Sequence, residues 1–353
     1  MKILKPVSSK IKSAFLSYVL GLILTKNKKT CSSMAKVLGV THDFLYRFLS
    51  KTYLLLPLLP HLMISLVNHF DKEKLGWLII DDTTISKPFA RFLEGVSQIY
   101  NTALGRTDRG LSIVVIAWSN GKITIPLKFG WAFHKDVAGD NYKTKSMIAK
   151  ELLLFFLKRI KFQYLLIDGH YTTKELLRFM LCWNIKFVGK FACNRKIESS
   201  NGMVEQVRNH PLLKLLRNFR SRKIKATYDE MKFYMSSHKR KNRNGEYKYI
   251  YLISSMDLSA KEYLSLYGKR WEIETMFRTM KQSLGLAQCC SRKIERQESH
   301  IYAVFLSFSF LQNEKKVGRF KNPEQAQRHL EMLKLEDVTM RMDRFSWNFD
   351  YVA

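Results

Sequence analysis

The sequence predicts an α/β fold, in which helices flank a mixed sheet and a helical region precedes it. Apolar runs typical of buried strands alternate with helical patterns between residues 77 and 190, and this order favours parallel strands late in the sheet. The turn Ser119-Asn120-Gly121 predicts a hairpin, because Asn-Gly readily adopts the positive φ of a tight turn. A basic segment, residues 190–248, interrupts the pattern before a last strand and a helix complete it.

The composition limits the classes of function that this chain can have. Its 353 residues are 46% hydrophobic, which is enough for a packed core and excludes general disorder. A net charge of +30 opposes folding unless a polyanion screens it, so we expect nucleic acid or an anionic membrane surface as partner. The longest apolar stretches are shorter than the ~18–20 residues of a membrane-spanning helix. Five cysteines without a CxxC pair fit a reducing cytoplasm.

The N-terminal region, residues 1–72, is predicted to be helical and to contain a helix-turn-helix. The small Ala35, the turn residue Gly39 and the apolar Leu45 have the spacing of two short helices packed across a tight turn. Arg47 would then lie on or near the helix that enters a DNA groove. An ordinary helical hairpin gives the same pattern and stays open as an alternative.

The elements of the predicted sheet follow in a regular order. Strands are expected where apolar runs are short, and helices where apolar residues recur with helical spacing. The last helix is expected to be long. The expected strands are 77–80, 111–118, 122–129, 163–167, 185–190 and 247–254, and the expected helices are 143–158, 172–183 and 259–284.

Acidic residues stand at the ends of two of these strands. Asp82, with Asp81 beside it, follows the first strand, and Asp168 follows the strand 163–167. A carboxylate at the end of a buried strand loses solvation unless something compensates it, and a divalent cation is one such compensation. A helix-capping or turn aspartate is the simpler explanation for either residue alone.

The last helix carries four polar residues at regular spacing. Tyr267, Arg270, Glu274 and Lys281 fall on one face at about 100° per residue. Arginine and lysine suit phosphate binding, and the single carboxylate among them could complete a metal site. The alternative is a solvated face with an Arg270–Glu274 ion pair, which is worth a few tenths of a kcal/mol.

These four residues carry a resemblance to a known family. The string Tyr267-x2-Arg270-x3-Glu274-x6-Lys281 resembles the signature of DDE transposases of the insertion sequence four family. Ile80-Asp-Asp-Thr-Thr84 resembles the family's first-aspartate strand, and Ile167-Asp-Gly-His-Tyr171 resembles its second. The resemblance covers residues 75–310, about two-thirds of the chain.

The resemblance implies an RNase H-like catalytic core with a β-rich insertion. It implies a catalytic, metal-binding triad of Asp82, Asp168 and Glu274, with Asp81 as the alternative to Asp82. Two Mg²⁺ ions would be the cofactors, and Mn²⁺ would substitute for them. The DNA phosphates would be contacted by Tyr267, Arg270 and Lys281. Trp271 would either stack on a base or pack in the core.

The basic segment occupies the position of the insertion. It has sixteen Lys and Arg against five Asp and Glu. Its most basic stretch is expected to bind DNA through Lys239, Arg240, Lys241 and Arg243. Lys190 and Arg195, at and after the end of strand 185–190, are expected to line the DNA channel.

The implied function is that of a prokaryotic, cytoplasmic DNA transposase that cuts the ends of an insertion sequence and joins them to target DNA. A homodimer would hold two element ends. The alternatives are an RNase H-like nuclease without strand transfer and an inactive protein that still binds element ends. The predicted divisions are 1–72 (DNA-binding), 73–192 and 247–312 (core), 193–246 (insertion) and 313–353 (tail).

Overall fold

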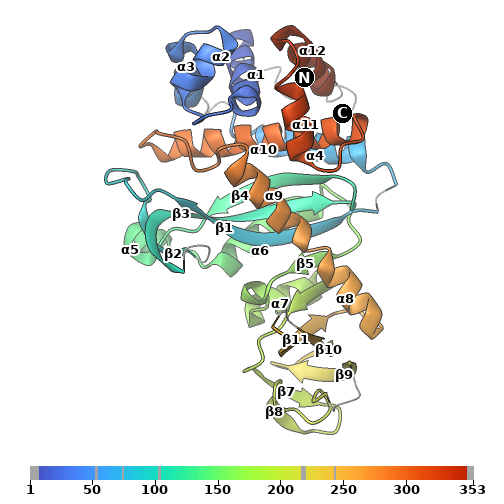
Figure 1. Ribbon diagram of the computed structural model, residues 1–353. Coiled ribbons are helices and arrows are strands. Elements are labelled where there is room, and N and C mark those ends of the chain that lie inside the picture. Colours follow the sequence, from blue (N-terminus) through green and yellow to red (C-terminus); the bar gives the residue numbers. More distant parts are fainter. Residues whose placement is uncertain are drawn as a thin grey trace.

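The computed structural model describes residues 8–51, 55–73, 75–101, 105–215, 220–241 and 244–347. Helices from both ends of the chain form one tier, the long helix α10 (Ile294–Val317) lies beneath them, and a mixed sheet follows (Figure 1). The inserted strands continue this sheet at its far end. The α/β fold class with N-terminal helices is therefore confirmed.

The N-terminal tier contains two short helices joined by a tight turn. Thr30 caps the first of them, and Gly39 ends it in the left-handed region at φ +66. The chain can therefore reverse and start the next helix at His42. Ala35 and Leu45 are buried where the helices pack. The helices of this region are α1 (Ser9–Leu24), α2 (Cys31–Leu38), α3 (His42–Lys51) and α4 (Leu59–Phe70).

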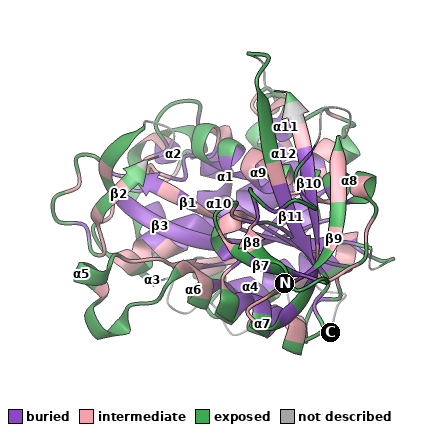
Figure 2. Cartoon of the chain, turned by 90° about the horizontal axis from the view of Figure 1, so that it is seen from below, coloured by how far each residue is buried: buried purple, intermediate pink, exposed green. Residues whose placement is uncertain are grey.

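The sheet has antiparallel strands on one side of its first strand and parallel strands on the other. β1 (Trp77–Ser86) pairs antiparallel with β3 (Arg106–Ser119) and parallel with β5 (Leu165–Ile167). β5 pairs parallel with β6 (Phe187–Lys190), as the order of elements predicts. Buried residues fill these central strands (Figure 2). The other two strands here, β2 (Ser97–Asn101) and β4 (Thr124–Trp131), both pair with β3.

The first strand is longer than expected. It does not end at Ile80 but continues to Ser86, because β3 pairs with it along its whole length. Asp81 and Asp82 therefore lie inside β1, not after it. Successive side chains of a strand point in different directions, so the two neighbouring carboxylates can contact different partners.

Helices cover both faces of this sheet. α6 (Lys145–Leu157) and α7 (Lys174–Cys182) contact each other on one face, close to the expected positions. The expected single helix 259–284 is wrong, because it is two helices that cross the other face (Figure 1). α8 (Ala260–Gly268) ends before α9 (Trp271–Gln282) begins, and bonds from residue i to residue i−3 tighten the junction at Lys269 and Arg270.

The basic segment is β-rich, as the resemblance implies. Its strands extend the sheet beyond β6, to which β11 (Tyr247–Ser254) pairs antiparallel. β10 (Met231–Lys241) and β9 (Ser221–Tyr228) follow in the sheet. The outermost strands are β7 (Lys196–Ser199) and β8 (Val204–Gln206).

The two C-terminal helices pack against α10, and the first of them also packs against α1. The Gln327 side chain in α11 (Pro323–Leu330) donates to the Ile23 carbonyl of α1 at 2.9 Å. Arg341 in α12 (Leu335–Trp347) pairs with Glu314 of α10 at 2.9 Å. Among the described helices, none has the length and apolar character needed to cross a membrane.

A buried histidine joins these tiers and gives a stability prediction. The His300 ring donates from Nε2 to the Gly285 carbonyl at 3.0 Å, and its Nδ1 accepts from the Tyr18 hydroxyl at 2.9 Å, which requires the neutral ring. Burial, aided by Lys87, lowers the pKa of His300 from 6.5 to about 4. The contribution of the neutral His300 ring to folding stability is therefore complete above pH 6.5, and it is lost as the pH falls toward 4.

When the pH falls from 7 to 5, we expect His300 to lower the free energy of unfolding by about 2 kcal/mol. The reason is that the unfolded chain binds a proton there that the folded chain excludes. Urea unfolding at the two pH values measures the loss, and His300→Gln should reduce the pH dependence by that amount. An unchanged pH dependence in the variant would contradict the assignment.

Candidate active site

Three of the predicted acidic residues lie at the same edge of the sheet. Asp81 and Asp82 are in β1, and Asp168 directly follows β5 and begins the short 3₁₀-helix η4 (Gly169–Tyr171). Ile80 pairs with Ile167 across the parallel strands, so Asp81 and Asp168 follow at the same level. Open α/β sheets commonly bind ligands at this carboxyl edge.

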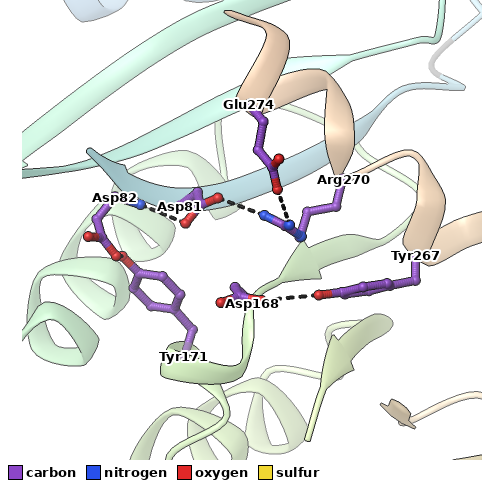
Figure 3. Close-up of polar contacts among 7 residues, drawn as sticks. All are labelled: Asp81, Asp82, Asp168, Tyr171, Tyr267, Arg270 and Glu274. Atoms are coloured by element: carbon purple, nitrogen blue, oxygen red, sulfur yellow. Dashed lines mark hydrogen bonds and ion pairs between the residues drawn. The ribbon is translucent and has the colours of Figure 1, made fainter. Parts of the chain in front are cut away.

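The two adjacent aspartates have different partners (Figure 3). Asp81 faces α9, where its Oδ2 pairs with the Arg270 guanidinium at 2.7 Å. Asp82 accepts a hydrogen bond from the Tyr171 hydroxyl at 3.0 Å and pairs with the Lys145 ammonium at 2.5 Å. Asp81 is therefore bound by an arginine, and Asp82 by a lysine and a tyrosine.

Arg270 links β1 to the helix that carries Glu274. Its guanidinium contacts Asp81 with one nitrogen and the Glu274 carboxylate with another. The arginine and Asp81 side chains are only 13% and 17% exposed, so this bridge is largely removed from water. Tyr267 completes the arrangement, because its hydroxyl donates to Asp168 at 3.1 Å. Figure 3 shows Arg270 between Asp81 and Glu274.

Burial dominates the electrostatics of this group. It raises the pKa of Asp81 to about 7, although Arg270 opposes the shift; Asp82 and Asp168 add to it. Burial also raises the pKa of Tyr267 well above its ordinary value, so the phenol stays a hydrogen-bond donor.

Lys281 is the fourth residue of the predicted face. The residue is exposed overall, but nearby protein atoms desolvate its ammonium group. This partial burial lowers the pKa of Lys281, and Asp82 opposes the shift. The expectation of one helical face is corrected, because Tyr267 is in α8, Arg270 at the junction, and the other two in α9. The fold nevertheless brings all four to the carboxylates.

The donor atoms suit a divalent cation, but they are not gathered around one point. In the part of the chain that the structure describes, no three His, Cys, Asp or Glu side chains are close enough to hold a metal ion. The carboxylates are instead neutralised by Arg270 and Lys145. Arg270 Nε is buried without a hydrogen-bond partner, so the guanidinium is incompletely satisfied where it lies.

The structure places three other predicted residues beside this edge. Trp271 is 61% exposed, so the alternative of core packing is wrong. Lys190 is exposed at the end of β6. Arg195 donates to the Thr172 carbonyl and stacks on Phe191 at 4.9 Å, which ties the insertion to the core.

The basic residues of the insertion and α3 lie further away in the fold. Lys239 lies 3.9 Å from the centre of the Tyr247 ring, and Lys241 is exposed at the end of β10. Arg240 is in the same strand, and Arg243 lies outside the described residues. Arg47 is exposed on α3, as a DNA-contacting residue would be.

Lys145 is the site residue that the sequence does not reveal. It stands at the start of α6, directly after the capping Thr144, and resembles any first-turn lysine. Nothing in its spacing connects it with Asp82, which is 63 positions earlier. Only the return of α6 to the sheet brings the two together.

Comparison with known protein families gives a match to the region that holds this site. The family model for the transposase DDE domain matches residues 72–310, about two-thirds of the chain. The matched region begins just before β1 and includes the four acidic residues of the sheet edge and α9. No curated protein matches the chain significantly.

Proposed function

Because the chain belongs to the transposase DDE domain family, we propose that it is the DNA transposase of an insertion sequence. Its fold is the RNase H-like fold of that family. The observation that carries the proposal is the meeting of Asp168, Glu274 and the β1 aspartates at one sheet edge, with Tyr267 and Arg270 bound to them. The chain would cut element ends and join them to target DNA.

Membership of the insertion sequence four family is the finer part of this proposal. It rests on the spacing of Tyr267, Arg270, Glu274 and Lys281, which the fold assembles from two helices. Such a grouping of cationic and phenolic groups beside carboxylates suits a phosphodiester next to its reaction centre. The same grouping favours strand transfer over simple hydrolysis by a nuclease.

Asp82, Asp168 and Glu274 would hold Mg²⁺, or Mn²⁺ in its place. When bound, such ions activate the attacking oxygen and stabilise the leaving oxygen of an in-line displacement. The chain's own contribution is to position the substrate. Arg270 would exchange its carboxylate partners for a DNA phosphate, and Lys281 would contact a neighbouring phosphate. Trp271, exposed at the start of α9, would stack on a base.

The choice between the β1 aspartates gives a prediction. Arg270 bridges Asp81 to Glu274, whereas Asp82 pairs with Lys145, accepts from Tyr171 and lies near Lys281. We therefore expect Asp82→Asn to abolish metal-dependent cleavage, and Asp81→Asn to reduce it about tenfold, because Arg270 loses one of the two carboxylates that position it. Cleavage rates on one DNA substrate measure both. The reverse ranking would make Asp81 the metal ligand.

The function itself is tested with the sequences that flank the gene. Terminal inverted repeats define the substrate, and a duplex with that end is incubated with the protein and Mg²⁺. The proposal expects a metal-dependent nick that leaves a free 3′-OH at the element end. A protein that binds this duplex but never cuts it would instead be an end-binding relic.

A further inference from the structure

We propose that the loop between β1 and β2 carries a second DNA-binding feature, a stacking site for unpaired bases. It consists of Phe89, Phe92, Arg91 and Arg292. The inference rests on the proposed function only in taking DNA as the ligand, and it concerns a surface separate from the carboxylates.

The loop exposes two large aromatic side chains. Phe89 is 94% exposed and Phe92 is 74% exposed, the highest and third-highest exposed fractions among the large hydrophobic residues that the structure describes. A phenylalanine left in water forgoes about 2–3 kcal/mol of burial free energy. Two such rings three residues apart indicate a surface that a ligand covers.

The loop that presents these rings is anchored at both ends. At its start, the buried Lys87 ammonium donates to the carbonyls of Ala287 and Cys289 at 2.8 and 2.6 Å. At its end, the Glu94 carboxylate pairs with Lys293 at 2.5 Å and accepts from the Ile294 amide at 3.0 Å. The two ends of the loop that carries the rings are therefore fixed before a ligand arrives, which lowers the entropy that the loop loses on binding.

The surroundings of the rings are basic. A cavity of about 660 Å³ lies between the loop and residues 287–292, and the charged side chains that line it are Lys28, Lys87, Arg91 and Arg292. The Arg292 guanidinium lies 5.6 Å from the centre of the Phe92 ring. Aromatic rings beside guanidinium groups are the combination that stacks bases and neutralises phosphates.

A neighbouring cavity extends this basic surface toward the N-terminal helices. It shares residues 288–292 with the first and is also lined by Lys29, Arg296 and Tyr46 of α3. In the other direction, Phe89 follows Asp82 by seven residues, a reach of at most about 25 Å. A DNA strand could therefore pass from α3 over the loop to the carboxylates.

Unpaired bases fit this site better than a duplex or a second copy of the chain. Bases inside a duplex are already stacked on one another, so only an extruded or single-stranded base can stack on Phe89 or Phe92. A second copy would bring another chain of net charge +30 against Lys28, Arg91 and Arg292. Like charges would oppose that contact.

The test compares two DNA probes without metal, so that no cleavage is needed. One is a blunt duplex and the other is the same duplex with an oligo-dT overhang. The double variant Phe89→Ala/Phe92→Ala should lose about 30-fold or more in affinity for the overhang probe, because it removes two rings and each stacked base contributes ~1–3 kcal/mol. Its affinity for the blunt duplex should stay within about twofold. Met332→Ala is the control, because Met332 is 76% exposed outside this surface.

Four results would overturn the inference. An equal loss on both probes, or no loss on either, would show that the rings do not recognise unpaired bases. Dissociation of a dimer in the double variant, measured by light scattering, would show that a second copy covers them. If the parent protein binds neither probe, DNA is not the ligand and the proposed function fails as well.

Discussion

Asp168→Asn and Glu274→Gln are each expected to reduce metal-dependent cleavage by about a thousandfold or more, while DNA binding stays close to that of the parent. Each variant removes one carboxylate charge at the sheet edge without changing side-chain size. Stabilisation of the leaving and attacking oxygens by bound metal is worth several kcal/mol, and each 1.4 kcal/mol is a factor of ten in rate. Initial rates of nicking on an end duplex measure the effect.

Glu272→Gln is the matched control for this loss. Glu272 is in the same helix, two positions before Glu274, but the structure gives it no contact with the β1 aspartates or Asp168. Its variant should cut at nearly the parent rate. If it is as damaging as Glu274→Gln, the loss reports a disturbed α9 and not a missing ligand.

Arg270→Gln is expected to have two opposite effects. In the absence of DNA it should raise the affinity for Mn²⁺ by about tenfold or more, because the guanidinium no longer neutralises Asp81 and Glu274. On the end duplex it should lower cleavage by about 10- to 100-fold, since a charged hydrogen bond to phosphate is worth about 1.5–3 kcal/mol. Calorimetric Mn²⁺ titration and nicking rates measure the two effects.

Arg270→Lys separates charge from geometry. Lysine keeps the positive charge but cannot bridge two carboxylates with a planar fork. It should therefore restore part of the DNA-dependent activity. If Arg270→Gln neither gains affinity for Mn²⁺ nor loses cleavage activity, the bridge between β1 and α9 is only structural.

Much of this fold could be predicted because its signals are local. β5 and β6 lie within the apolar runs 163–167 and 185–190 that predict them. Asn120-Gly121 forms the predicted turn, with Gly121 at φ +83. The continuation of β1 to Ser86 could not be predicted in this way. Its polar residues resemble a loop, and only the pairing with β3 makes them a strand.

The residues of the candidate site could be proposed from the sequence, but their contacts could not. Fixed spacing identifies Tyr267, Arg270, Glu274 and Lys281, yet helical periodicity alone misses the break after Gly268. The Lys145–Asp82 pair and the anchoring of the loop by Lys87 depend on chain segments that are far apart in sequence. Such pairings follow from tertiary packing, which no local pattern encodes.

The most direct measurement of the central claim is a strand-transfer assay. An end duplex that already carries a free 3′-OH is incubated with the protein, Mg²⁺ and a supercoiled plasmid. A transposase is expected to join that 3′-OH to the plasmid, and Glu274→Gln should give no joined product. Cleavage of the end duplex without any joining would contradict the account and identify a nuclease.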